Sequence, residues 1–144
     1  MGLFDKLRGT EGQLNAAEGF AGIALAAVAA DGVLTEEEAQ SLGATLSRMK
    51  LFRAMNPREF NAVFEKVVKR ARSKGVDTLL AESSAAIPKD LRATAFAIST
   101  DLVLADGEVS DDELKFLERI AKSLEVPEAE AERIVEVLQI KNRG

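Results

Sequence analysis

The sequence contains no cysteine, no histidine, no tyrosine and no tryptophan. Without cysteine there is no disulfide, no thiolate nucleophile and no zinc–thiolate site. Without histidine, the usual general base near neutral pH and the commonest transition-metal ligand are missing. Any metal site must therefore use carboxylates, carbonyls, hydroxyls and water, the ligands that calcium, magnesium and manganese prefer.

Long apolar runs are missing as well. No segment reaches the roughly 18 apolar residues of a membrane-spanning helix, so we do not expect an integral membrane protein. The segment Met1–Arg8 lacks the apolar centre of a secretory signal. Leu3, Phe4 and Leu7 give it a small apolar face, and we expect residues 1–12 to form an N-terminal arm. This arm either packs on the domain or touches a membrane or a partner.

What remains is the composition of one ordinary globular domain. The chain has 144 residues, of which 47% are hydrophobic and 30% charged, enough to form a core of its own. The net charge of −5 argues against a nucleic-acid partner, because nucleic-acid binding requires a basic surface.

The apolar pattern is helical throughout. Apolar residues recur at intervals of three and four, and no segment alternates long enough to form a strand. Thr35 with Glu38, and Ser110 with Glu113, fit capping boxes, and Asn56 precedes a proline at a helix start. We therefore expect an all-α fold, a single compact domain of about six to seven helices within residues 13–144. The expected helices cover about 13–30, 35–49, 56–74, 77–87, 88–105, 110–124 and 127–138.

Two features bear on helix packing. Gly19 and Gly22 cost helix propensity, but their small size lets another helix approach closely. The segment 88–105 is apolar on several faces, through Phe96 and Val103 among others, which predicts a position near the centre.

The chain contains an internal repeat. A shift of 75 positions places residues 28–35 on residues 103–110, so that an Ala-Asp-Gly turn occurs twice. The same helix–turn–helix unit is therefore expected at about 20–52 and 95–127. Two copies are too few for a solenoid and predict a globular domain with pseudo-twofold character. Other positions that match under this shift are Ile23 with Ile98, Glu38 with Glu113, and Leu42 with Leu117.

Each turn partly matches a calcium-binding EF-hand loop. With Gly32 at position 6 of such a loop, Glu38 falls at position 12, and Gly107 and Glu113 stand in the same relation. However, positions 1 and 3 fall on alanine in the first turn and on leucine in the second. Half of the ligands are missing, so neither turn is a standard EF-hand.

Four acidic residues remain as candidate metal ligands: Asp31, Glu38, Asp106 and Glu113. A purely structural explanation is that the glutamates complete capping boxes and the aspartates bond to the backbone of a tight turn. The functional explanation is that the two turns meet and their acids bind one hard divalent cation, calcium or magnesium. The sequence leaves both explanations open.

A basic group stands in the middle of the chain. It consists of Lys66, Lys69, Arg70, Arg72 and Lys74, near the end of an expected helix. Cations are favourable at a helix C-terminus, so a solvated helix end explains the group. The alternative is a surface that binds an anionic partner, such as lipid headgroups or an acidic protein.

The two Ala-Asp-Gly turns, at 30–32 and 105–107, resemble those of the TerB tellurite-resistance family, as do residues 100–105 and the tail at 134–138. The resemblance covers about residues 19–142. It implies a cytoplasmic, all-helical domain in two pseudo-symmetric halves, with a role in resistance to tellurite and related stresses. It also implies an integral-membrane partner at the inner membrane face, and metal ligation by the turn acids, here Asp31, Glu38, Asp106 and Glu113.

Nothing in the sequence indicates an enzyme. No nucleophile stands beside an obvious base, and no glycine-rich phosphate loop occurs. Without cysteine, this chain cannot reduce tellurite through a thiol. Two functions remain: a cation-responsive stress-response protein that docks a membrane-associated partner, or a metal-independent helical adaptor. The sequence does not indicate an oligomeric state.

Overall fold

The computed structural model describes residues 13–29, 34–105 and 109–143, and in these ranges the chain is helical and contains no strand. The described part holds eight α-helices rather than the six to seven expected. The additional helix, α4, is a single turn, too short to produce a periodic pattern. In chain order the elements are α2 (Ala16–Val28), α3 (Glu36–Ser47), α4 (Lys50–Arg53), α5 (Pro57–Lys74), α6 (Val76–Ala86), the 3₁₀ turn η1 (Lys89–Leu91), α7 (Arg92–Leu104), α8 (Asp111–Ser123) and α9 (Glu128–Lys141).

Capping boxes fix the starts of four helices. In each, a side chain accepts a hydrogen bond from the backbone of the third helical residue, whose own side chain accepts from the capping residue. The boxes expected before α3 and α8 are confirmed, as is the asparagine cap before α5. The box before α2 was not expected, and it starts that helix at Ala16 instead of Gln13. The pairs are Asn15 with Glu18, Thr35 with Glu38, Asn56 with Glu59, and Ser110 with Glu113.

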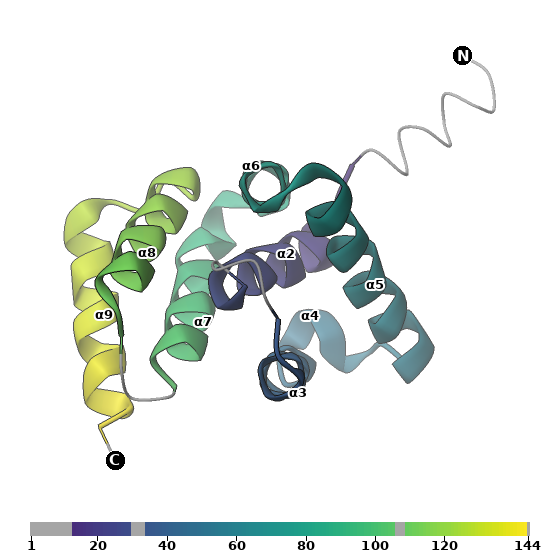
Figure 1. Cartoon of the computed structure of the whole chain (residues 1–144), viewed down its shortest axis with the longest axis horizontal. Helices are drawn as coiled ribbons and strands as arrows, with labels where there is room; N and C mark the ends of the chain where they lie inside the picture. Colours follow the sequence, from purple (N-terminus) through teal and green to yellow (C-terminus); the bar gives the residue numbers. More distant parts are fainter. Residues whose placement is uncertain (1–12, 30–33, 106–108, 144) are drawn as a thin grey trace.

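Helix α2 lies at the centre of the molecule (Figure 1). It packs against α5, α6 and α7 and also contacts α3 and α8, and every residue from Ala17 to Ala27 is buried. Helix α7 packs on α2 on one side and on α9 on another, and leaves Ile98 and Leu102 half-buried. Both helices therefore lie near the centre, as expected for the 88–105 segment, and α2 is the more completely buried of the two.

Glycine allows α6 to lie close against α2, as the sequence predicted. A Cβ atom at Gly22 would stand 2.0 Å from the Ser83 hydroxyl oxygen, and one at Gly19 would stand 2.9 Å from the Ser83 carbonyl oxygen. The Ser83 hydroxyl is buried and has no hydrogen-bond partner among the described residues. The close approach of these two helices therefore depends on the absence of a side chain at Gly19 and Gly22.

A tight turn joins α8 to α9. Glu125 adopts a left-handed backbone conformation, with φ 58°, that is usually occupied by glycine. The backbone N–H of Glu125 donates to Lys122 O at 3.1 Å, and that of Val126 donates to Ala121 O at 2.9 Å. These two bonds form a Schellman motif. The Glu125 carboxylate lies 3.0 Å from the Arg92 guanidinium at the start of α7.

Candidate functional site

Glu38 and Glu113 occupy equivalent places at the starts of α3 and α8. One carboxylate oxygen of Glu38 accepts from the Thr35 backbone N–H at 3.1 Å, and one of Glu113 accepts from the Ser110 N–H at 3.1 Å. Both glutamates are half-buried. Within the described residues, the second oxygen of each carboxylate forms no hydrogen bond. A glutamate can therefore cap its helix and still offer one oxygen to a cation.

The other two candidate ligands, Asp31 and Asp106, lie outside the described residues. Among the residues that the structure describes, no three acidic side chains are close enough to hold a metal ion. A cation site at the turns would therefore require the two aspartates in addition to Glu38 and Glu113.

The five basic residues of the middle segment divide into two groups on α5. Lys66, Arg70 and Lys74 are spaced four apart and so share one face of the helix. Lys66 forms an ion pair with Glu18 of α2 at 3.1 Å. Arg70 is buried and pairs with Glu82 of α6, and Lys74 lies 3.2 Å from the same carboxylate. The shared face therefore holds α5 against its neighbours.

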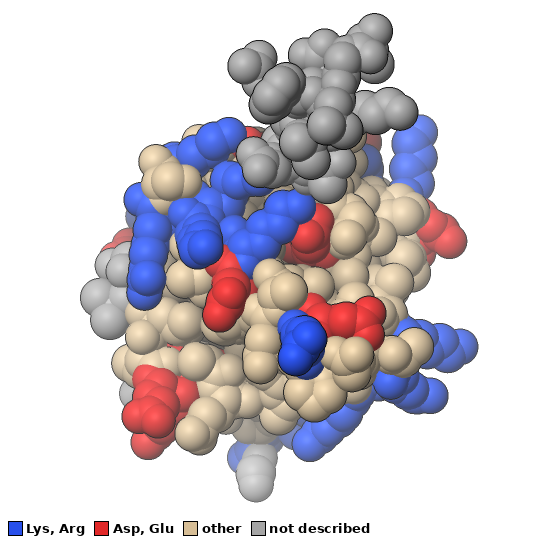
Figure 2. Space-filling model, turned by 90° about the vertical axis from the view of Figure 1, so that its right-hand side faces the viewer, with Lys and Arg blue, Asp and Glu red and all other residues tan. Residues whose placement is uncertain are grey.

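Lys69 and Arg72 belong to the outer part of α5, and their side chains are exposed. Figure 2 shows lysine and arginine side chains gathered on the face that carries α5, with acidic side chains among them. An anionic partner would thus meet a smaller positive charge than the sequence predicts. The sequence could not show this, because Glu18 and Glu82 are far from Lys66 and Arg70 along the chain.

Glu82 is the acid that joins α5 to α6 most directly. Desolvation by burial raises the pKa of Glu82, but the hydrogen bonds from Arg70 and Lys74 and the attraction of their positive charges outweigh it. The net effect holds the pKa of Glu82 below its ordinary value. This carboxylate is therefore charged at neutral pH and stabilises the folded state.

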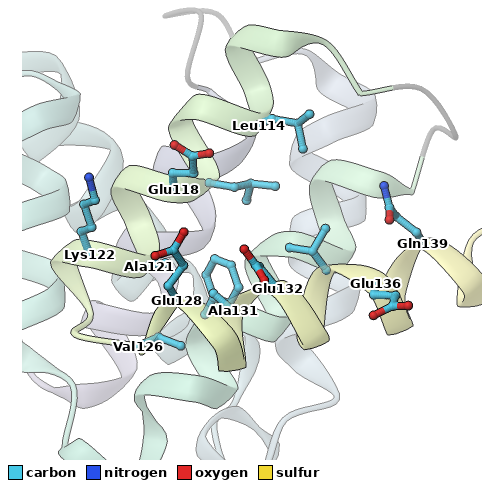
Figure 3. A pocket seen from close by; sticks show the side chains of 13 residues that line it. Leu114, Glu118, Ala121, Lys122, Val126, Glu128, Ala131, Glu132, Glu136 and Gln139 are labelled. Atoms are coloured by element: carbon cyan, nitrogen blue, oxygen red, sulfur yellow. The ribbon is translucent and has the colours of Figure 1, made fainter.

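A groove of about 440 Å³ lies between α8 and α9 (Figure 3). These two helices stand at the other end of the molecule from α5 (Figure 1). We call the space between them the α8–α9 groove. Its floor is apolar, Ala121 near the end of α8 and Val126 of the connecting turn are among the residues that line it, and acidic side chains stand at its edges. The lining residues are Phe96 of α7, then Leu114, Leu117, Glu118, Ala121 and Lys122 of α8, Val126, and Glu128, Ala131, Glu132, Val135, Glu136 and Gln139 of α9.

This groove is not among the sites that the sequence predicts. The signal is present in α9, where Glu128, Glu132 and Glu136 repeat every four residues beside Ala131 and Val135. Such a row of acids next to apolar residues also occurs on any helix that packs on its own domain. Only the tertiary structure shows that the row faces a cavity.

The described part of the chain holds no helix long and apolar enough to cross a membrane. The described residues form an all-α domain in which, twice, a helix that precedes an Ala-Asp-Gly sequence is followed by a helix with a capping box. Residues 17–136 match the family described as tellurite resistance protein TerB, and the chain belongs to this family. No curated protein and no solved structure matches it.

Proposed function

We propose that this protein is a non-enzymatic stress-response protein of the tellurite-resistance type. In this proposal the acids of its two turns bind a hard divalent cation, calcium or magnesium, and the protein docks a membrane-associated protein partner. The observation that carries the proposal is the repetition of one capped, acidic helix start, with the same hydrogen-bond lengths, in a chain of the TerB family.

The charges around the turns support weak cation binding. The first turns of α3 and α8 each carry three acidic residues, at positions 36–38 and 111–113. The positive end of a helix dipole repels a cation, so several carboxylates are needed to offset it. Asp31, Glu38, Asp106 and Glu113 would be the ligands, and the remaining acids would raise the local cation concentration.

Reciprocal helix contacts support the pseudo-twofold relation between the two units. Helix α3 contacts both α2 and α7, and α8 contacts both α7 and α2. Each capped helix thus lies against the buried helix of its own unit and of the other. We propose that this arrangement brings the turn acids of both units to one site.

Four of the described hydroxyl groups have structural partners, which is consistent with a role without catalysis. Ser84 and Ser123 hydrogen-bond to each other at 2.7 Å, and Ser99 and Thr100 donate to backbone carbonyls of α7 at 2.8 Å. These are structural contacts without a base that would activate a nucleophile.

A cytoplasmic position at the inner membrane face is consistent with the family, and the exposed Lys69 and Arg72 would face anionic headgroups there.

Calorimetric titration of metal-stripped protein with calcium, magnesium and manganese tests the cation site. We expect saturable binding with a defined stoichiometry, lost in Asp31→Asn/Asp106→Asn. The matched control is Glu37→Gln/Asp112→Asn, which removes the same charge from the neighbouring helix starts and should retain binding. Equal loss in both double variants would show a diffuse acidic surface, and unfolding of Asp31→Asn/Asp106→Asn would show that the aspartates are structural.

The second candidate is a metal-independent helical adaptor. It is favoured by the capping bonds of Glu38 and Glu113, which explain these two acids without a cation. A cation that binds the native state must raise the melting temperature by mass action. No heat and no thermal shift in millimolar calcium would therefore select the adaptor.

A further inference from the structure

The α8–α9 groove has the shape of a site for a third helix. Its two walls are consecutive helices of 13 and 14 residues joined by a tight turn, and α7 supplies its floor through Phe96. Helix α9 packs mainly on α7, which leaves the space between α8 and α9 open. An amphipathic helix that lies in an apolar groove between two helices is a common mode of peptide recognition.

The edges of the groove carry unbalanced negative charge. Figure 3 shows Glu118 of α8 on one side and Glu128 and Glu132 of α9 on the other, with Glu136 further along α9. Within the described residues, no ion pair joins any of these four carboxylates to a lysine or arginine. Lys122 is the only basic residue in the lining.

The spacing on α9 places like charges next to one another along one edge of the groove. Glu128, Glu132 and Glu136 are separated by four residues, an interval at which like charges on a helix repel each other. Among the described residues no acidic cluster suits a metal ion, so a bound cation does not account for these charges. Positive side chains of a bound segment would relieve the repulsion.

We propose that the α8–α9 groove binds a basic amphipathic helix of the protein partner, a Lys/Arg-rich segment next to a membrane-spanning helix. This inference rests on the proposed docking function and specifies the surface and the partner chemistry. Cytoplasmic segments of membrane proteins carry an excess of lysine and arginine, which matches the acidic edges. Apolar residues at positions i, i+3 or i+4, and i+7 of that segment contact the apolar floor.

A synthetic peptide tests the proposal without knowledge of the natural partner. The probe is an amphipathic helix of about four turns with leucines on one face, lysines flanking them and one tryptophan. The protein has no tryptophan or tyrosine, so the fluorescence of the peptide reports binding. The control peptide carries glutamate at every lysine position. We expect the lysine peptide to bind and the glutamate peptide not to bind at physiological salt.

Charge variants of the protein locate the site. Glu128→Gln/Glu132→Gln/Glu136→Gln should weaken binding of the lysine peptide roughly tenfold, because each exposed charge pair contributes modestly. These substitutions remove repulsion within α9, so the variant should fold. The matched control Glu37→Gln/Glu65→Gln/Asp90→Asn removes three exposed acids from other elements and should change the affinity less than about twofold.

The same titration followed by NMR shows where the peptide lies. Shifts concentrated on α8 and α9 would support the proposal. Equal weakening in both triple variants, shifts centred on α5, or equal binding of the glutamate peptide would overturn it. Concentration-dependent self-association that is abolished by the α9 variant would also overturn it, because a second copy would then fill the groove. Metal-free protein is used throughout, so loss of peptide binding is distinct from failure of the cation site.

Discussion

Helices α2 and α7 precede the two matching turns, yet they are buried to very different extents. All residues of α2 from Ala17 to Ala27 are buried, whereas α7 buries six of its 13 residues. Where α2 has Gly19 and Gly22, the 75-residue shift gives α7 Thr94 and Ala97, and Thr94 is exposed. The same repeated sequence pattern thus gives one helix that is buried along nearly its whole length and one helix that is partly exposed.

The difference lies in side-chain size on one face of each helix. Glycine at two positions lets α6 pack against the backbone of α2, close enough that a Cβ at Gly22 would overlap Ser83. No α7 residue among those that the structure describes is a glycine. Small residues therefore explain why one of the two related helices is more completely buried than the other, while the caps decide where the helices begin.

The largest effect should come from adding a methyl group where α2 and α6 are in close contact. Gly22→Ala gains helix propensity, but its Cβ overlaps the Ser83 hydroxyl, and we expect a net loss of about 1–3 kcal/mol in the free energy of unfolding. Adding Ser83→Ala should restore part of the loss, because it removes the overlapping oxygen. Urea unfolding followed by circular dichroism measures both changes.

Gly43 offers the matched control within α3. Nothing lies within 4 Å of a Cβ built there, so Gly43→Ala should stabilise the protein by about 0.5–1 kcal/mol. If Gly22→Ala also stabilised the protein, close contact with α6 would not explain why α2 is more buried than α7.

The two capping boxes should respond alike, in contrast to the helices that precede them. Thr35→Ala and Ser110→Ala each remove a hydroxyl that accepts a 3.1 Å bond from the third helical residue. Each should cost about 1 kcal/mol, and the double variant about the sum, since distant sites usually add. Thermal or urea unfolding of the three variants checks this. A clear difference between the two single variants would mean that the turns are not energetically equivalent.

The smallest effect concerns the pH dependence of the ion pairs that Glu82 of α6 forms with α5. The pKa of Glu82 is lowered in the folded state, so its contribution to stability is present above the ordinary glutamate pKa and is lost as the pH falls through the lowered value. Glu82→Gln should cost less than about 1 kcal/mol at neutral pH, and its difference from the unmodified protein should shrink as the pH falls below the ordinary glutamate pKa and disappear below the lowered one. Asp77→Asn, which breaks an exposed ion pair with Arg119, should give a smaller difference. Denaturant titrations across this pH range would contradict the prediction if the difference grew in acid.

Local features of the fold could be predicted from the sequence, because a cap or a helix end depends on residues within one turn of each other. Thr35, Asn56, Gly75 and Ser110 mark their boundaries in the structure as expected. The arrangement of the helices could not be predicted in the same way. The central position of α2 depends on its fit to Ser83, more than fifty residues further along the chain.

The candidate sites show the same division. The roles of Glu38 and Glu113 as caps followed from their spacing, whereas the partners of Lys66 and Arg70 come from other helices. The α8–α9 groove is a property of two helices and a floor, and no single segment indicates it. Asp31 and Asp106 lie outside the described residues, so their role as ligands stays a prediction.

The central position of α2 also has a consequence for how the chain folds during synthesis. Helix α2 ends at Val28, but two of the helices that cover it, α6 and α7, extend over residues 76–104. The apolar surface of α2 is therefore covered only after residues 76–104 have folded back onto it. Contacts between residues this far apart in the sequence slow folding. A nascent chain that stops before α7 exposes its most apolar helix, a state prone to aggregation. The first helix that the structure describes is thus among the last to be fully covered.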